Sequence, residues 1–148
     1  MPSLQKYSYP FFAPPGRIPG PYLPITIENP LTKNNILWYC LIDSGADSCL
    51  FSGSVASILG HNLKGNGVRS QVTMGVEGQR VKTWLHTFSL WLMHPSRPDI
   101  AVWKSRKGLF ECIEHDECPQ LLGVDDFLRN FRVTLDYTAQ KTTVQWKD

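Results

Sequence analysis

The strongest constraint on the fold is a carboxylate placed at the end of an apolar run. Residues 38–42 are apolar, Asp43 follows them directly, and Ser44 and Gly45 turn the chain before apolar character returns at Leu50. An apolar run bounded by turn-forming residues predicts a buried strand. Asp43 then emerges at a surface of low dielectric, where a carboxyl group can perform acid/base chemistry near neutral pH.

The composition is that of a single globular domain. The chain has 148 residues, of which 42% are hydrophobic and 19% are charged. Its formal net charge of +2 is too small to indicate nucleic acid or an anionic membrane as a partner. No stretch has the length of a membrane span, and the first residues lack the pattern of a secretion signal. The 4 cysteines are few for a disulfide scaffold, so we expect a cytoplasmic protein.

The N-terminal segment differs in composition from the rest of the chain. Most of the 11 prolines lie before residue 25, interleaved with tyrosine and phenylalanine. Proline supplies no backbone N–H group and is excluded from helix interiors. We therefore expect residues 1–20 to form an extended arm, either loose or lying along the domain or a partner. Residues 21–148 then form the folded domain.

The residues around Asp43 predict a hairpin before it and a helix after it. Residues 22–30 alternate between apolar and polar side chains and end in Asn-Pro, which indicates a strand followed by a turn. Residues 36–42 return as the second strand and deliver Asp43. Residues 54–60 predict a short helix, because Val55, Ile58 and Leu59 have helical spacing and Gly60 suits its end.

A second hairpin is predicted over residues 72–84. Gly75 and Gly78 lie there between residues of high β propensity, which is typical of a long hairpin with a tip near residues 74–78. Residues 85–93 continue as a strand. Residues 94–108 carry several basic side chains around a small apolar cluster and predict an exposed loop, whose charges we expect to be solvated and not to bind nucleic acid.

A metal site is an alternative for the next segment. Cys112, His115 and Cys118 bring three zinc-type ligands close together in the sequence. Zinc takes four protein ligands in a structural site, or three and a water in a catalytic one, and this spacing matches no common zinc motif. On an extended strand, Cys112 and His115 would also face opposite sides. A strand followed by an acidic turn is therefore the main interpretation, and we expect no metal or other cofactor.

The second informative motif is an apolar pair and a glycine followed by acidic residues. Leu121, Leu122 and Gly123 lead into residues 125–131, where the apolar spacing predicts a helix. Asp125 and Asp126 would lie in its first turn and interact with the helix dipole, because neighbouring side chains on a helix point about 100° apart and cannot share one substrate atom. Residues 132–136 and 141–146 alternate around a turn and predict a final hairpin.

Asp-Ser-Gly-Ala after an apolar strand, a glycine hairpin, and Leu-Leu-Gly before a short helix together resemble the retropepsin-like (retroviral-type) aspartic proteases. The resemblance spans residues 21–146. It implies an all-β fold with one or two short helices, a single-lobe acid protease barrel that forms a homodimer. Asp-Ser-Gly taken alone also suits an ordinary turn, so the combination of motifs carries the resemblance.

The resemblance also implies roles for individual residues. Asp43 would be the catalytic acid/base, with Ser44 orienting the loop and Gly45 leaving room for the substrate backbone. The positions implied to contact the substrate follow this glycine or form the hairpin tip, and they are Ala46, Asp47, Met74, Gly75, Val76, Glu77 and Gly78. The implied supports of the catalytic loop are Leu121, Leu122 and Gly123.

Two departures from the viral pattern favour a cellular or bacterial lineage. The viral enzymes place an arginine directly after the second glycine, where this chain has Val124. They place another before the first strand, where the nearest basic residue here is Arg17, so Asp47 would lack its partner. The leading hypothesis is an aspartic endopeptidase that cuts peptide or protein substrates as a homodimer. The alternative is a non-catalytic peptide-binding or dimerisation module of the same fold.

Overall fold

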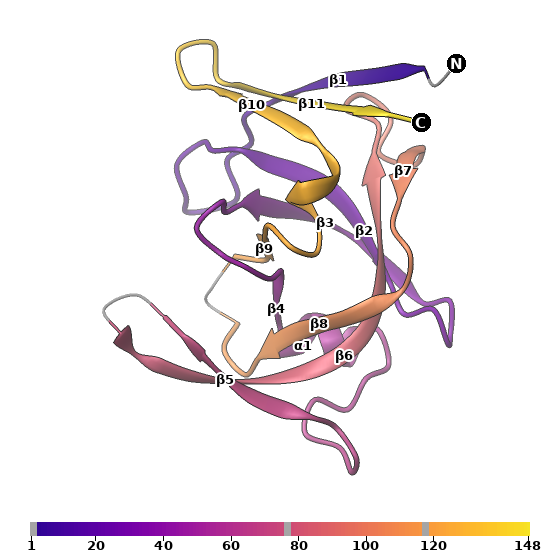
Figure 1. Cartoon of the computed structure of the whole chain (residues 1–148), viewed down its shortest axis with the longest axis vertical. Coiled ribbons are helices and arrows are strands. Elements are labelled where there is room, and N and C mark those ends of the chain that lie inside the picture. Colours follow the sequence, from indigo (N-terminus) through magenta and orange to yellow (C-terminus); the bar gives the residue numbers. More distant parts are fainter. Residues whose placement is uncertain (1–2, 76–77, 117–118) are drawn as a thin grey trace.

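The computed structural model is built mainly of β-strands, as predicted (Figure 1). It describes residues 3–75, 78–116 and 119–148. The strands form an eight-stranded sheet that is strongly curved and a separate three-stranded sheet. None of the described helices is long and apolar enough to cross a bilayer.

The hairpin expected before Asp43 is confirmed. Strand β2 (Tyr22–Glu28) pairs antiparallel with β3 (Asn35–Ile42), in a register that places Tyr22 opposite Leu41. Every residue of β2 is buried, because β2 also pairs with β6 (Arg80–Met93) on its other side. Asp43 follows β3 directly and is therefore anchored to the centre of the fold.

The helix expected after the Asp43 loop is also present. Strand β4 (Leu50–Ser52) leads into helix α1 (Gly53–Ile58), whose first turn is capped by the Ser52 hydroxyl accepting from the Val55 N–H at 3.4 Å. Gly60 lies beyond the end of the helix with φ +91°, a conformation that favours glycine. The predicted capping residue at the start of this helix and the predicted glycine after its end are therefore confirmed.

The glycine hairpin forms as expected and projects from the body of the molecule (Figure 1). Strand β5 (Ser70–Met74) pairs with the first part of β6, and β6 runs on without interruption to Met93. Strand β8 (Gly108–Ile113) pairs with the middle of β6. Strand β6 therefore connects the projecting hairpin to the core, because it pairs with β5 near its start and with β8 and β2 further along.

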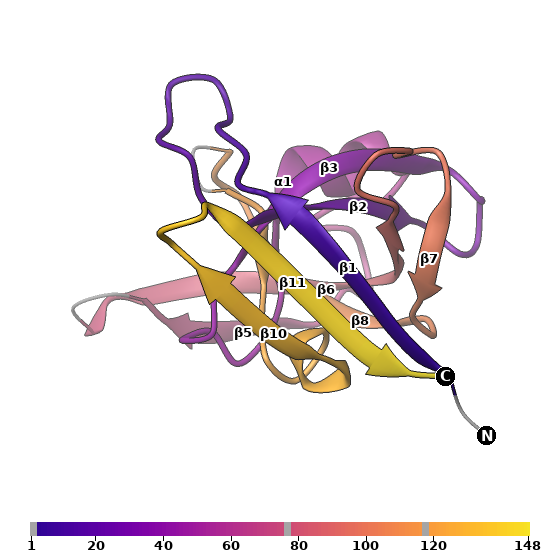
Figure 2. The ribbon, with the colours of Figure 1, turned by 90° about the horizontal axis from the view of Figure 1, so that it is seen from above.

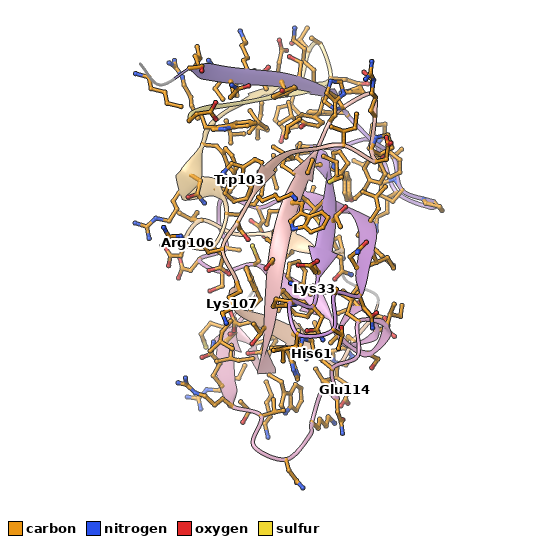
Figure 3. The ribbon with its side chains drawn as sticks, turned by 90° about the vertical axis from the view of Figure 1, so that its right-hand side faces the viewer. Lys33, His61, Trp103, Arg106, Lys107 and Glu114 are labelled. Carbon is orange, nitrogen blue, oxygen red and sulfur yellow. The ribbon has the colours of Figure 1, made fainter. Side chains whose placement is uncertain are left out.

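The segment expected to be a basic loop contains a strand. Residues Ala101–Lys104 form β7, which pairs with the end of β6. The apolar cluster predicted within this loop accounts for the strand, since Trp103 packs edge-on against Phe127 and Phe131 with ring centroids 5.6 and 4.8 Å apart. The basic side chains remain exposed, and Arg106 and Lys107 lie along the β7–β8 connection (Figure 3).

The helix predicted over residues 125–131 is wrong. Strand β9 (Leu121–Leu122) is followed by turns and by a single 3₁₀ turn, η2 (Leu128–Asn130). The N–H groups of Leu128 and Arg129 donate to carbonyls five residues back, not four as in an α-helix. The chain is wound more widely here, with Phe127 fully buried and Asp126 turned towards the Asp43 loop.

The three-stranded sheet joins the two ends of the chain. Strand β1 (Leu4–Pro10) pairs with β11 (Lys141–Lys147), which also pairs with β10 (Arg132–Asp136), and the sheet lies across one end of the molecule (Figure 2). The final hairpin is thereby confirmed. The segment expected to be an arm contains β1, whose Tyr9 is 1% exposed and donates to the Met93 carbonyl at 2.6 Å. The domain boundary at residues 20–21 stays a prediction.

Candidate active site

The position of Asp43 is fixed by strands that come from distant parts of the sequence. Strand β3 pairs in parallel with β9, with Ile42 opposite Leu122, and the Asp43 N–H continues the pairing by donating to the Leu122 carbonyl at 3.1 Å. Strand β4 pairs with the other side of β9 at Leu121. Because β9 lies between the strands that enter and leave the loop, it fixes both ends of the loop.

The loop turns around the Asp43 carboxylate. Oxygen Oδ1 accepts from the Gly45 N–H at 3.0 Å, and the Ala46 N–H donates to the Asp43 carbonyl at 3.1 Å. Among the described residues, oxygen Oδ2 accepts no hydrogen bond, and the side chain is partly exposed. One oxygen is therefore oriented by the backbone, while the other is free to meet a water or a second carboxyl group.

The expected roles of Ser44 and Asp47 are less evident. Both residues are exposed, and within the part of the chain that the structure describes neither side chain has a hydrogen-bond or ion-pair partner. The loop is held by backbone contacts instead.

The second motif packs directly against the loop. The N–H groups of Val124 and Asp125 donate to the carbonyls of Ala46 and Asp47 at 2.9 and 2.7 Å. A Cβ atom added at Gly123 would lie 2.3 Å from the carbonyl carbon of Ser48. Only glycine allows this approach, so the loop backbone requires a glycine at position 123.

A carboxylate holds the exit of the loop. Oxygen Oδ2 of Asp126 accepts from the Cys49 N–H at 2.8 Å, and this contact replaces the helix-dipole role predicted from the sequence. Burial raises the pKa of Asp126, the hydrogen bond from Cys49 lowers it, and the nearby charges of Asp125 and Glu111 raise it, with the increase prevailing. Asp126 is thus a partly buried structural carboxylate close to the site.

The hairpin tip is described in part. Met74 is 63% exposed, the Gly75 N–H donates to the Gln79 carbonyl at 2.7 Å, and Gly78 has φ +75°. Val76 and Glu77 lie outside the described residues. A left-handed glycine at the tip is typical of a tight hairpin turn.

Sequence reasoning missed Glu111. This residue of β8 is 7% exposed, and its oxygen Oε1 accepts from Gln71 and Thr83 at 2.9 Å each and from the Thr73 hydroxyl. Its only signal in the sequence is an acid within the apolar run of residues 109–113. Its partners are brought to it by the fold, so spacing alone does not reveal the cluster.

The described residues contain no cluster of three or more histidine, cysteine or acidic side chains suited to a metal ion. Cys112 is buried in β8, and burial followed by the charge of Glu111 raises its pKa to about 12. Cys118, the last member of the alternative zinc set, lies outside the described residues. Metal binding by Cys112 and His115 therefore gains no support from their surroundings.

Two cavities of the described chain are not lined by Asp43. One, of about 440 Å³, is bordered by Trp103, Asp126 and Arg129, and another, of about 340 Å³, is bordered by Phe12 and Trp38. Asp43 lines neither of them. Asp43 itself is partly exposed in the isolated chain.

Comparison with known proteins gives structural neighbours only. No protein-family model and no curated protein sequence matches the chain. The structure is similar to that of a retropepsin-like aspartic protease from Rickettsia conorii, with 12% identity, a TM-score of 0.60, and 99% of this chain and 95% of that chain covered. It is also similar to the retroviral protease-like domain of Ddi1 from Leishmania major, with 17% identity, a TM-score of 0.46, and coverage of 82% and 85%.

Proposed function

From the retropepsin-like fold that this chain has, we propose that it is an aspartic endopeptidase that works as a homodimer. The observation that carries the proposal is the Asp43 loop, with one carboxylate oxygen held by the Gly45 N–H and the loop braced by Gly123–Asp125.

Peptide hydrolysis by this chemistry needs two carboxyl groups that share one proton. One carboxylate activates a water, and the protonated partner donates a hydrogen bond to the carbonyl oxygen of the substrate. The chain has one Asp-Ser-Gly sequence, so the second group comes from Asp43 of a second copy related by a twofold axis. The partial exposure of Asp43 in the isolated chain fits this arrangement.

The substrate is an extended peptide or protein segment. It would lie between the two loops and beneath the β5–β6 hairpin, with main-chain hydrogen bonds giving affinity as in strand addition. In this arrangement Gly45 and Ala46 leave room for the substrate backbone, and residues 74–78 cover it.

Three buried free cysteines, Cys40, Cys49 and Cys112, support a reducing cytoplasmic location.

A non-catalytic module of the same fold is the second candidate. Val124 stands where the viral enzymes have an arginine, and Asp47 has no ion-pair partner within the described residues. These features weaken the viral type of dimer contact. In this alternative the same surface binds peptide or a second copy without cleaving anything.

Asp43→Asn tests the proposal. The substitution keeps the side-chain volume and removes the shared proton, so cleavage of a peptide library followed by mass spectrometry should fall by about 100-fold or more. Asp99→Asn is the matched control, because Asp99 is exposed in the turn between β6 and β7 and belongs to neither motif of the candidate site. Equal cleavage by the parent and Asp43→Asn would exclude Asp43 as the catalytic group, and absence of cleavage by the parent would favour the non-catalytic module.

A further inference from the structure

Three polar side chains on one face of the β5–β6 hairpin contact the neighbouring strand β8. Gln71 and Thr73 are two residues apart on β5 and share one face, and Thr83 pairs directly with Gln71 across the hairpin. The opposite face carries Val72 and Met74, which are 59% and 63% exposed. The same face carries Lys82 and Arg80, which pair with Val72 and Met74, so apolar and basic side chains are mixed there.

Polar side chains make a specific contact between the hairpin and β8. The hairpin's described side-chain hydrogen bonds to the rest of the molecule all end on Glu111, from Gln71, Thr73 and Thr83. A carboxylate that accepts several bonds in a buried place forms strong charge-assisted contacts. Glu111 thus joins both strands of the hairpin to β8.

Glu111 also lies at the exit of the Asp43 loop. It is the parallel partner of Leu50, the first residue of β4 after that loop. Burial raises the pKa of Glu111, but the contacts from Thr73, Gln71, Thr83 and the nearby Ser48 side chain lower it more, so the ionised form is favoured. One side chain consequently contacts the hairpin and borders the loop.

We propose that Glu111 is a positioning residue that fixes the β5–β6 hairpin against β8, beside the strand that leaves the Asp43 loop. Its effect on turnover rests on the proposed protease function, whereas its effect on the hairpin does not. Glu111 is not a binding group for a basic substrate side chain, because it is 7% exposed and its Oε1 is occupied by three donors from the protein itself.

The test pairs Thr73→Val with Thr73→Ser and adds Glu111→Gln. Valine has the shape of threonine without the hydroxyl, and serine keeps the hydroxyl. Of the two Thr73 variants, therefore, the valine variant should loosen the hairpin and the serine variant should not. Thr134→Val, on the exposed part of β10, controls for the loss of a hydroxyl from a strand. Thr73 is half-buried, so its variants remain informative if Glu111→Gln fails to fold.

The first measurement is the NMR order parameters of the β5 amides, with the β2 amides as an internal reference. We expect the order parameters of the β5 amides to fall from about 0.85 to below about 0.6 in Thr73→Val and Glu111→Gln. The β2 amides of these variants should keep the parent values. In Thr73→Ser and Thr134→Val, the β5 amides should also keep the parent values. Unchanged order parameters of the β5 amides in Thr73→Val, and in Glu111→Gln if that variant folds, would overturn the proposal.

The second measurement is peptide turnover. A loosened hairpin should raise KM and lower kcat together, reducing kcat/KM by about tenfold, whereas simple destabilisation lowers only the active fraction and leaves KM unchanged. A change in kcat alone would overturn the positioning role in turnover. If β5 loosens as expected but no form of the protein cleaves peptide, the positioning of the hairpin stands and the protease function fails.

Discussion

Gly123 is the residue with the least freedom in the candidate site. Its missing side chain leaves the space that the carbonyl of Ser48 occupies, since an added Cβ would lie 2.4 Å from that oxygen and 2.8 Å from the Cys49 nitrogen. Both neighbouring atoms belong to the backbone, so no side chain can move aside. Any larger residue must displace the loop that presents Asp43.

Gly123→Ala should therefore destabilise the protein by about 1–3 kcal/mol or more, and it should abolish peptide cleavage. Urea unfolding and a cleavage assay measure the two effects. Gly108→Ala is the control, because a Cβ there would meet Phe110 at an ordinary 3.6 Å. Equal stability of the two variants would mean that the loop and the second motif can separate without cost.

Single residues differ in how far the sequence reveals them. Asp43 could be found because an acid interrupts an apolar run, and Gly123 because it follows a second apolar pair. The contacts of Glu111 could not be found, since its partners Gln71, Thr73 and Thr83 reach it only through the curvature of β6. Periodicity describes which face a residue occupies, but not which distant strand meets that face.

Elements with strong local signals were predicted well. The hairpins around residues 30 and 137 and helix α1 follow from alternation, turn residues and capping. The helix predicted over residues 125–131 failed because tertiary contacts of Asp126 and Phe127 outweigh its weak helical pattern. Strands β1 and β7 were missed because each is defined by its pairing partner and not by its own sequence.

At this scale, the prediction concerns how firmly β1 is attached. Tyr9→Phe leaves the buried Met93 carbonyl without its donor, so the free energy of unfolding should fall by about 1–2 kcal/mol. Tyr137→Phe is the matched control, since Tyr137 is 66% exposed. Chemical denaturation measures the free energy of unfolding of both variants. A shortened chain that begins at residue 21 lacks β1 altogether and should be less stable than either variant. Full stability of that shortened chain would show that residues 1–20 are a dispensable arm.

For the whole molecule, the proposed dimer makes association depend on pH. Two Asp43 carboxyl groups face to face cannot easily both ionise, so the dimer holds one proton more tightly than two separate chains do. The dimer is thereby favoured at acid pH, and this contribution is lost as the pH rises and the shared proton is released. The dilution midpoint should move to higher protein concentration in alkaline buffer.

Sedimentation of the parent and Asp43→Asn at two pH values measures this coupling. The variant has no proton to share, so the pH dependence of its association should largely disappear. A parent that remains monomeric at all concentrations would contradict the dimer. An equal pH response in both proteins would place the pH-sensitive contact elsewhere.

The three-stranded sheet also has a consequence for the order in which the chain can fold during synthesis. Its central strand is β11, the last of the three to be made, and both β1 and β10 pair only with β11 in this sheet of the described chain. Strand β1 must therefore wait with its edge unpaired until residues 141–147 have left the ribosome. A pairing between such distant segments closes slowly. The exposed edge of β1 is accordingly the point at which the growing chain most needs protection from other strands.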